Sequence, residues 1–309
     1  MSASRRVLVV GSANIDLVTR VPRIPRPGES VIGESFATFT GGKGANQAVA
    51  AARLGAQTWF AGCVGNDAFG EMQRASLAAE GIDLTYLKSH ATEPTGTAVI
   101  CVADSGENAI VVTPAANGGI TPDDAQSLES VMADSDIVLL QLEIPLDTVE
   151  AVLALARKRG VTSILDAGPA QKVSARLVEL ASIVSPNETE AEAMTGIRVN
   201  DVEAARHAGA HLIELGAREV VMKLGAHGAL YMSPVEWFHV PAFKIEAVDT
   251  VAAGDAFTAA LALMWGRAPT LDAVRFANAA GALAAMAAGA QPSMPTRAAV
   301  DAFLRERGH

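Results

Sequence analysis

Short apolar runs rich in β-branched residues recur along the chain and alternate with longer segments of helical periodicity. The runs predict buried strands at 7–10, 58–61, 137–140, 162–165, 182–184 and 220–224. The segments between them predict helices at 45–54, 71–79, 146–159 and 202–215. Because strands that alternate with helices of this length form βαβ units, the pattern predicts a mostly parallel sheet. Ligands of such sheets bind at the carboxyl ends of the strands.

Two regions break this alternation. Residues 17–40 contain several prolines followed by an alternating stretch, and residues 97–112 predict two strands, 98–102 and 109–112, around a polar turn. We expect these regions to form a small β lid over the ligand cleft, whose exposed edges favour pairing with a second subunit. After residue 255 the pattern predicts only helices, at 255–265, 271–288 and 296–307. No linker divides the chain, so we expect one α/β domain over residues 1–309 with the lid inserted in it.

Composition narrows the class of protein. The chain has 309 residues, half of them apolar, and 24 Lys and Arg against 34 Asp and Glu give a formal charge of −10. The apolar content excludes a disordered chain. Because acidic residues outnumber basic ones, the chain has no general positive charge to attract nucleic acid or an anionic membrane as a partner. Two cysteines are too few for a disulfide framework. No apolar stretch predicts a signal peptide or a spanning helix, so we expect a soluble, cytoplasmic protein.

The stretch from Asp249 to Asp255 reads Asp-Thr-Val-Ala-Ala-Gly-Asp and leads from a strand into a helix that we expect to open at Asp255. Small residues let a ligand approach the backbone, and free N–H groups at a helix start bind anions. A carboxylate beside an anion site makes sense if it faces a nucleophile. The alternative, that Asp255 only caps the helix, stays open. In either case the helix start is expected to hold the pKa of Asp255 low.

Two segments of the first half carry donors and acceptors suited to a small polar ligand. The segment Gly-Gly-Lys-Gly-Ala-Asn-Gln at 41–47 is not a Walker A loop, but it exposes backbone and offers Lys43 and Asn46 as donors. Asn14 and Asp16 follow the first strand, where a carboxylate can accept bonds from the vicinal hydroxyls of a sugar. A plain glycine-rich turn and an Asx turn are the respective alternatives.

Three further positions follow later strands. Glu143 comes after the strand at 137–140 and is another candidate hydroxyl ligand. Asn187 and Glu190 have the spacing of a capping box, although an amide and a carboxylate can also hold Mg²⁺ through water. The sequence Lys-Leu-Gly-Ala-His-Gly at 223–228 ends a strand with a tight turn that suits a nucleotide, with a simple β turn as the alternative.

Four of these motifs, in this order, resemble the ribokinase family of carbohydrate kinases. They are GSANID at 11–16, GGKGANQA at 41–48, PNETEAE at 186–192 and DTVAAGD at 249–255, and they span nearly the whole chain. The resemblance implies a ribokinase-like three-layer α/β sandwich with a mostly parallel central sheet and a small β-sheet lid. It implies transfer of the γ-phosphoryl group of ATP to the 5-hydroxyl of ribose. A kinase for deoxyribose, another sugar or a nucleoside, and a non-catalytic sugar sensor, remain as alternatives.

The resemblance also implies a role for individual residues. The catalytic base and the backbone of an anion hole are expected at Asp255, Gly254, Ala253 and Ala252. The sugar ligands are expected at Asn14, Asp16, Gly42, Lys43, Asn46, Glu143 and Asp255. The ATP contacts are expected at Asn187, Lys223, Gly225, Ala226, Gly228, Gly254 and Asn278.

Metal sites complete what the resemblance implies, whereas the exposed edges of the lid, rather than the resemblance, predict a homodimer through the lid. Glu190 is expected to organise Mg²⁺ through water. An activating monovalent cation, K⁺, is expected at Asp249, Val251, Ala284, Ala287, Gly289 and Ser293. Four positions depart from the family pattern. Lys223 stands where Thr is frequent, Asp166 stands where Asn is common, and Ala256 and Thr258 stand where larger or amide residues are frequent.

Overall fold

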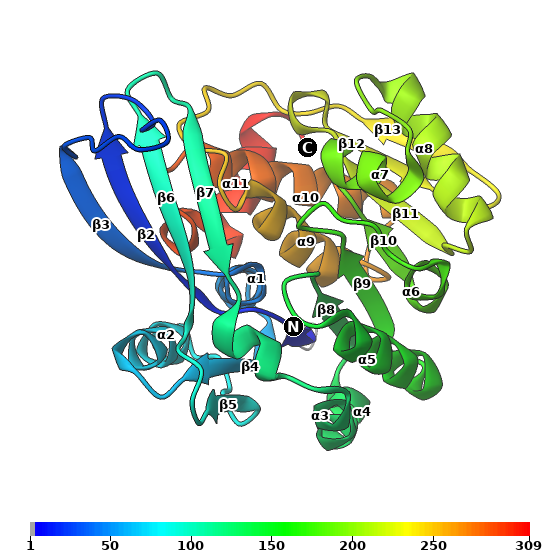
Figure 1. The fold of residues 1–309 in the computed structure, drawn as a ribbon. Helices are drawn as coiled ribbons and strands as arrows, with labels where there is room; N and C mark the ends of the chain where they lie inside the picture. Colours follow the sequence, from blue (N-terminus) through cyan, green and yellow to red (C-terminus); the bar gives the residue numbers. More distant parts are fainter. Residues whose placement is uncertain (1–3) are drawn as a thin grey trace.

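A computed structural model describes residues 4–309, so the first three residues of the expected domain lie outside it. A nine-stranded sheet forms the centre, and a separate four-stranded sheet stands beside it (Figure 1). In spatial order, the strands of the central sheet are β13 (Trp237–Val240), β12 (Ala229–Met232), β11 (Glu219–Lys223), β10 (Ile183–Ser185), β9 (Thr162–Asp166), β8 (Ile137–Leu140), β1 (Arg6–Val10), β4 (Gln57–Gly65) and β5 (Leu87–His90).

The central sheet is mostly parallel, as the alternation of strands and helices predicts. The strands from β11 to β5 run parallel, and only β12 and β13 add an antiparallel hairpin at one edge. The six strands predicted for this sheet all lie in it, within one residue of their predicted starts. The strand expected to lead into Asp249 is absent, because residues 241–250 form neither strand nor helix. The hairpin and β5 were not predicted.

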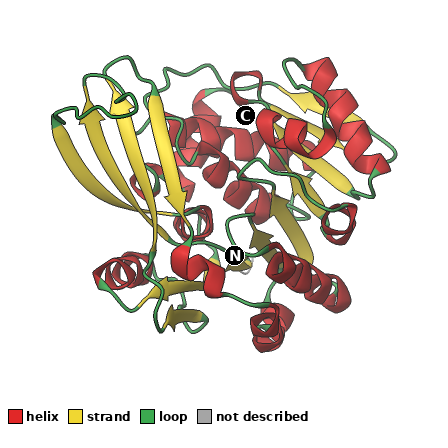
Figure 2. Cartoon of the chain, in the orientation of Figure 1, coloured by secondary structure: helices red, strands yellow, loops and turns green. Residues whose placement is uncertain are grey.

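Helices cover both faces of the central sheet, so the fold is a three-layer α/β sandwich (Figure 2). Side chains alternate between the faces along β1, where Val7 and Val9 enter one core and Leu8 and Val10 the other. The first core is covered by α1 (Lys43–Arg53), α2 (Ala68–Ala79), α9 (Ala253–Met264), α10 (Thr270–Ala285) and α11 (Arg297–Glu306). The second is covered by α3 (Pro122–Ser127), α4 (Glu129–Asp134), α5 (Leu146–Arg159), α6 (Ala175–Leu180), α7 (Glu188–Thr195) and α8 (Val202–Glu214).

The small sheet arises from the two regions that break the alternation. Its order is β3-β2-β6-β7, from β3 (Ser35–Gly41), β2 (Asn14–Val21), β6 (Gly96–Ala103) and β7 (Asn108–Thr113). Its two outer pairs are antiparallel, but the central pair of β2 and β6 is parallel. The strand expected from the alternating stretch begins only at Ser35, because the proline-rich residues before it form a loop. All residues of β7 are exposed.

Two helix boundaries differ from the prediction in ways that matter for the site. The helix expected to open at Asp255 begins two residues earlier, at Ala253, and α10 ends at Ala285 rather than at 288. Within residues 4–309, no helix combines the length and apolarity needed to cross a lipid bilayer. Short 3₁₀ helices complete the chain at η1 (Ala115–Gly119), η2 (Gly225–His227) and η3 (Gln291–Ser293).

Candidate active site

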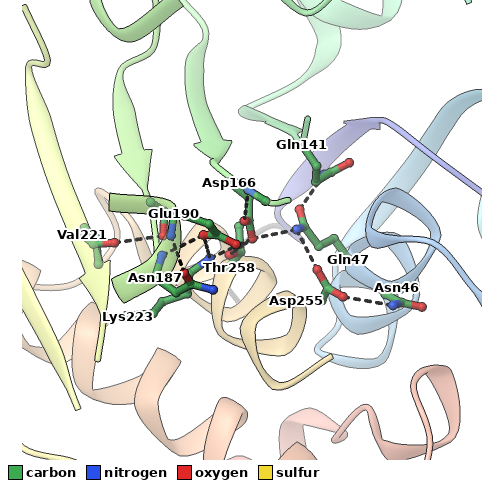
Figure 3. Close-up of polar contacts among 12 residues, drawn as sticks. Asn46, Gln47, Gln141, Asp166, Asn187, Glu190, Val221, Lys223, Asp255 and Thr258 are labelled. Carbon is green, nitrogen blue, oxygen red and sulfur yellow. Dashed lines mark hydrogen bonds and ion pairs between the residues drawn. The ribbon is translucent and has the colours of Figure 1, made fainter. Parts of the chain in front are cut away.

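The parallel strands β1, β8, β9, β10 and β11 end at one edge of the central sheet, where buried polar side chains gather (Figure 3). Helices α1, α7 and α9 all begin at this edge. Side chains far apart in the sequence therefore meet here, as the general rule for such sheets predicts.

The start of α9 leaves backbone donors free. Ala252 is the N-cap and adopts a left-handed backbone with a φ of 61°, which turns the chain sharply into the helix. The N–H of Ala253 donates to Thr250 O at 3.3 Å, whereas those of Ala252, Gly254 and Asp255 find no acceptor within residues 4–309. Free N–H groups at a helix start suit an anion.

Asp255 does not cap its helix. It is the third residue of α9, and only 3% of its surface is exposed. Its Oδ2 accepts a hydrogen bond from Asn46 Nδ2 at 3.0 Å and its Oδ1 accepts one from Gln47 Nε2 at 3.1 Å. The carboxylate therefore faces α1 across the site rather than its own backbone (Figure 3).

The pKa of Asp255 is raised, so the expectation of a low value is wrong. Burial raises this pKa to about 6, and the nearby charge of Asp166 acts in the same direction. Lys43 and the amides of Asn46 and Gln47 oppose the rise without cancelling it. Loss of hydration outweighs the partial charge of a helix start because the group is enclosed on every side.

Lys43 carries the positive charge at the centre of the site. Its burial acts to lower its pKa, but the carboxylates of Asp255, Asp166, Glu143 and Glu190 together raise it, so the ammonium stays charged. Lys43 and the second lysine of the cluster, Lys223, are outnumbered by these four carboxylates. The excess of acceptors suits a ligand with hydroxyl donors.

Glu143 links the end of β8 to the start of α1. Its Oε2 accepts a hydrogen bond from Ser12 Oγ at 2.5 Å and one from the backbone N–H of Lys43 at 3.0 Å. It thus supplies the acidic group that the first turn of α1 lacks.

The small sheet brings the remaining predicted sugar residues to the same place. The Oδ1 of Asn14 accepts a hydrogen bond from Asn117 Nδ2 at 2.7 Å, a partner that was not predicted. Burial raises the pKa of Asp16 to about 7, and the charges of Glu143 and Asp255 add to the rise. At Gly42, with a φ of 90°, a Cβ would lie 2.7 Å from the backbone nitrogen of Asn14, so only glycine fits.

The capping box at the start of α7 is present. Asn187 Oδ1 accepts from the N–H of Glu190 at 2.8 Å, and Glu190 Oε2 accepts from the N–H of Asn187 at 2.7 Å. Asn187 also forms an isolated β-bridge with Lys223. Capping explains the spacing of Asn187 and Glu190 without reference to a ligand.

The turn after β11 lies beside the end of β13. Gly225 and Ala226 are exposed in η2, and a Cβ at Gly228 would lie 2.1 Å from Val240 O. Asn278 on α10 donates its Nδ2 to the same Val240 O at 3.1 Å. The structure thus gathers the predicted nucleotide contacts along one side of the site, opposite the small sheet.

Two of the departures from the family pattern, Lys223 and Asp166, are partners. Lys223 Nζ lies 3.0 Å from Asp166 Oδ2, and both side chains are buried. Asp166 Oδ2 also accepts from Thr258 Oγ1 at 2.8 Å and from Gln47 Nε2 at 3.0 Å. Burial acts to raise the pKa of Asp166, but Lys223, Lys43 and the hydroxyl of Thr258 lower it below its usual value.

Gln47 and Gln141 were not predicted as site residues. Gln47 lies directly after Asn46 in the glycine-rich motif, and only this position in the sequence could have identified it as a site residue. Gln141, which donates to Gln47 Oε1 at 2.6 Å, follows β8 at the ligand edge of the sheet.

The residues expected around a monovalent cation lie in two neighbouring loops. Asp249 joins these loops, because its Oδ2 accepts from Gly289 N at 3.0 Å. Its Oδ1 accepts from Val251 N at 3.0 Å within its own loop. The N–H of Asp249 donates to Ala285 O at 3.1 Å. The Oγ of Ser293 donates to Ala290 O at 2.8 Å. The other members of the set, Ala284 and Ala287, lie at the end of α10 and just beyond it.

Within the described part of the chain, no three His, Cys, Asp or Glu side chains cluster closely enough to hold a metal ion. Glu190 offers a carboxylate on the nucleotide side, and its Oε2 lies 3.9 Å from Lys223 Nζ. A single carboxylate fits Mg²⁺ only if the ion keeps part of its water shell and takes most of its other ligands from phosphates.

Comparison with known proteins gives the family. Residues 4–297 match the pfkB family carbohydrate kinases. A ribokinase of Haemophilus influenzae is 40% identical over 97% of this chain and 98% of its own, and a deoxyribokinase of Salmonella typhi is 32% identical over 94% and 95%. The structure of an Arabidopsis thaliana ribokinase complexed with ribose and ATP superposes with a TM-score of 0.90, at 35% identity over 98% of this chain and 99% of that one. Because these similarities extend over nearly the whole sequence and fold, the chain belongs to the pfkB family of carbohydrate kinases.

Proposed function

We propose that this chain transfers the γ-phosphoryl group of ATP to the 5-hydroxyl of ribose, giving ribose 5-phosphate and ADP. One observation carries the proposal: the buried carboxylate of Asp255 lies at a helix start where the N–H groups of Ala252, Gly254 and Asp255 find no acceptor within residues 4–309. The residues predicted to bind the sugar lie on one side of this carboxylate, and the glycine turn after β11 lies on the other. The relatives named above support ATP and ribose as the substrate pair.

In the proposed reaction, a bond forms between the 5-oxygen and the γ-phosphorus. The bond to the bridging oxygen breaks, ADP leaves, and the hydroxyl proton passes to Asp255. With a pKa of about 6, Asp255 is ionised at neutral pH and can accept this proton. Phosphoryl transfer passes through a loose transition state, so alignment and charge stabilisation are the main contributions of the protein.

The sugar is held by Asn14, Asp16, Lys43, Asn46 and Glu143. Carboxylates and amides at these positions can bond adjacent hydroxyls in pairs. The backbone of Gly42 lies next to Asn14, where a ligand can approach it closely.

The nucleotide is held by the residues of the opposite side, namely Asn187, Lys223, Gly225, Ala226, Gly228, Gly254 and Asn278. The negative charge that develops during transfer meets the N–H groups of the anion hole at Ala252, Ala253 and Gly254. Because Ala253 already donates to Thr250, the donors of Ala252, Gly254 and Asp255 itself are the available ones. A well-placed donor of this kind is worth about 3 kcal/mol of transition-state stabilisation.

Two cations complete the proposal. Mg²⁺ supplies charge neutralisation on the phosphates when bound, and Glu190 holds it through water. K⁺ is proposed to bind beside the anion hole, at Asp249, Val251, Ala284, Ala287, Gly289 and Ser293. The hydrogen bond from Gly289 N to Asp249 Oδ2 supports this set, because it holds the two loops together.

The small sheet is proposed to act as a lid in one domain of residues 1–309 and as the interface of a homodimer. The lid corresponds to the regions 17–40 and 97–112, and it would exclude water that otherwise hydrolyses ATP. The use of ATP and the free cysteines at 63 and 101 favour the cytoplasm as the site of action.

A coupled assay of ADP release tests the function. Ribose, 2-deoxyribose, fructose and adenosine are compared, each with and without K⁺. We expect the highest kcat/KM for ribose. A higher kcat/KM for 2-deoxyribose would identify that sugar as the preferred substrate. If no acceptor led to ADP release, the result would contradict a kinase and favour a sugar sensor.

A further inference from the structure

The side chain of Gln47 is completely buried at the centre of the site (Figure 3). Its Nε2 donates to Asp255 Oδ1 at 3.1 Å and to Asp166 Oδ2 at 3.0 Å. Its Oε1 accepts from Gln141 Nε2 at 2.6 Å. One amide on α1 therefore joins α9, β9 and the end of β8.

The chemistry of the amide fixes its orientation. A primary amide has two N–H donors, and here each carboxylate takes one of them. The opposite orientation would direct Oε1 at two carboxylates and the N–H groups at the donor of Gln141. Gln47 therefore has a single favourable arrangement, and the position of Asp255 Oδ1 depends on it.

The partner carboxylate, Asp166, is anchored from the nucleotide side. It accepts from Thr258 Oγ1 and pairs with Lys223 Nζ. Lys223 in turn lies beside the start of α9, since a Cβ at Gly254 would be 3.8 Å from its Nζ. A continuous series of polar contacts, one ion pair and two hydrogen bonds, thus runs from Lys223 at the end of β11 through Asp166 and Gln47 to Asp255.

We propose that Gln47 is the positioning residue of Asp255 and that the pair of Asp166 and Lys223 anchors Gln47 from the nucleotide side. This inference rests on the proposed function. Asn46 fixes Oδ2 and Gln47 fixes Oδ1, so together they set the plane of the carboxylate that faces the sugar hydroxyl. Gln47 makes no contact with either substrate in this scheme.

The test replaces Gln47 with methionine, which has a similar volume and no N–H donor. In Gln47→Met, we expect kcat to fall roughly ten- to a hundredfold, the effect of losing one hydrogen bond to a charged group in the transition state. The KM values for ribose and ATP should stay within about threefold, because Gln47 binds neither substrate. Thr148→Val is the matched control, since it removes a buried side-chain hydrogen bond, to Ile120 O, away from the site.

The pH profile separates positioning from packing. The charged groups around Asp255 are Lys43 on the same helix as Gln47, Asp166 on β9, Lys223 beyond it, and Asp16 on β2. Gln47→Met removes a donor that favours the ionised carboxylate, so the acidic limb of kcat should move to higher pH. Asp166→Asn removes a negative charge, so the same limb should move to lower pH. A residue that only fills space would move neither limb.

A second variant keeps the test decisive if Gln47→Met does not fold. Gln141→Met removes only the bond to Gln47 Oε1 and touches neither carboxylate, and we expect kcat to fall about threefold to tenfold with unchanged KM values. A kcat within twofold of the parent and an unmoved acidic limb, in whichever of the two variants folds, would overturn the inference. If the parent itself releases no ADP with ribose, the proposed function fails instead.

Discussion

At the scale of single residues, the charge state of Asp255 follows from competition between two effects. A helix start stabilises a carboxylate by about 0.3–1 kcal/mol at exposed positions, whereas the loss of hydration of an enclosed charge costs more. In this site burial prevails and the pKa rises. The carboxylate is therefore a stronger base than an exposed aspartate.

Replacing this carboxylate tests its role as the base. Asp255→Asn keeps the shape of the side chain but cannot accept the hydroxyl proton. We expect kcat to fall by roughly 10²–10⁴, the usual contribution of a general base, while calorimetry still detects ribose and ATP binding. A kcat near that of the parent would remove the assignment.

The raised pKa also predicts how activity depends on pH. Below about pH 6 Asp255 becomes protonated and can no longer accept a proton, so kcat should rise with pH through this value and then level off. A profile of kcat from about pH 5 to 8 measures this. A kcat that stays constant down to pH 5 contradicts an ionised Asp255 as the base.

Lys223 and Asp166 are expected to depend on one another. Lys223→Thr leaves Asp166 buried with Lys43 as its remaining cation, so stability should fall toward the lower end of about 3–5 kcal/mol, the cost of breaking a buried ion pair. The double variant Lys223→Thr with Asp166→Asn should recover most of this loss. Urea unfolding of both variants and the parent measures it, and strictly additive effects would refute the coupling.

At the scale of secondary structure, the small sheet has an apolar surface that faces solvent. Val99 and Val111 are paired across β6 and β7 and are 45% and 65% exposed. Ile110 and Val112, which point to the other face of β7, are also exposed. An edge strand of this kind favours association with a second copy.

A charge on this surface should disrupt the proposed dimer. We expect Val111→Lys to give a monomer by light scattering after gel filtration, while the parent is a dimer. Val235→Lys is the control, because Val235 is 91% exposed in the turn between β12 and β13, away from the small sheet. A parent that is monomeric at every concentration excludes the interface.

The strands of the central sheet could be predicted because they are buried on both faces. Runs such as 137–140 are continuously apolar, and continuous runs identify parallel strands in the core. The hairpin of β12 and β13 follows a glycine turn that was interpreted as a ligand loop, so its strands were missed. Short helices such as α6 were missed because six residues give too little periodicity to detect.

At the scale of the whole molecule, Asp249 joins the loop that precedes α9 to the loop that follows α10. A cation held there would stabilise the sharp turn at Ala252 that directs the free N–H groups of α9. Replacing K⁺ with tetramethylammonium, which is too bulky for a cage of carbonyls, should lower kcat several-fold. In Asp249→Asn the response to K⁺ should weaken, and equal activity in both salts would count against the site.

The sequence by itself determined the order and type of most elements, the four motifs and which residues are candidates for binding ligands. These depend on local patterns, which a single chain displays directly. Tertiary structure alone decided which side chains share a hydrogen bond. Gln47 and Asp255 are 208 positions apart, and Gln47 and Asp166 are 119 apart. The charge of a buried group depends on such distant neighbours and on the exclusion of water, and neither is visible in a local pattern.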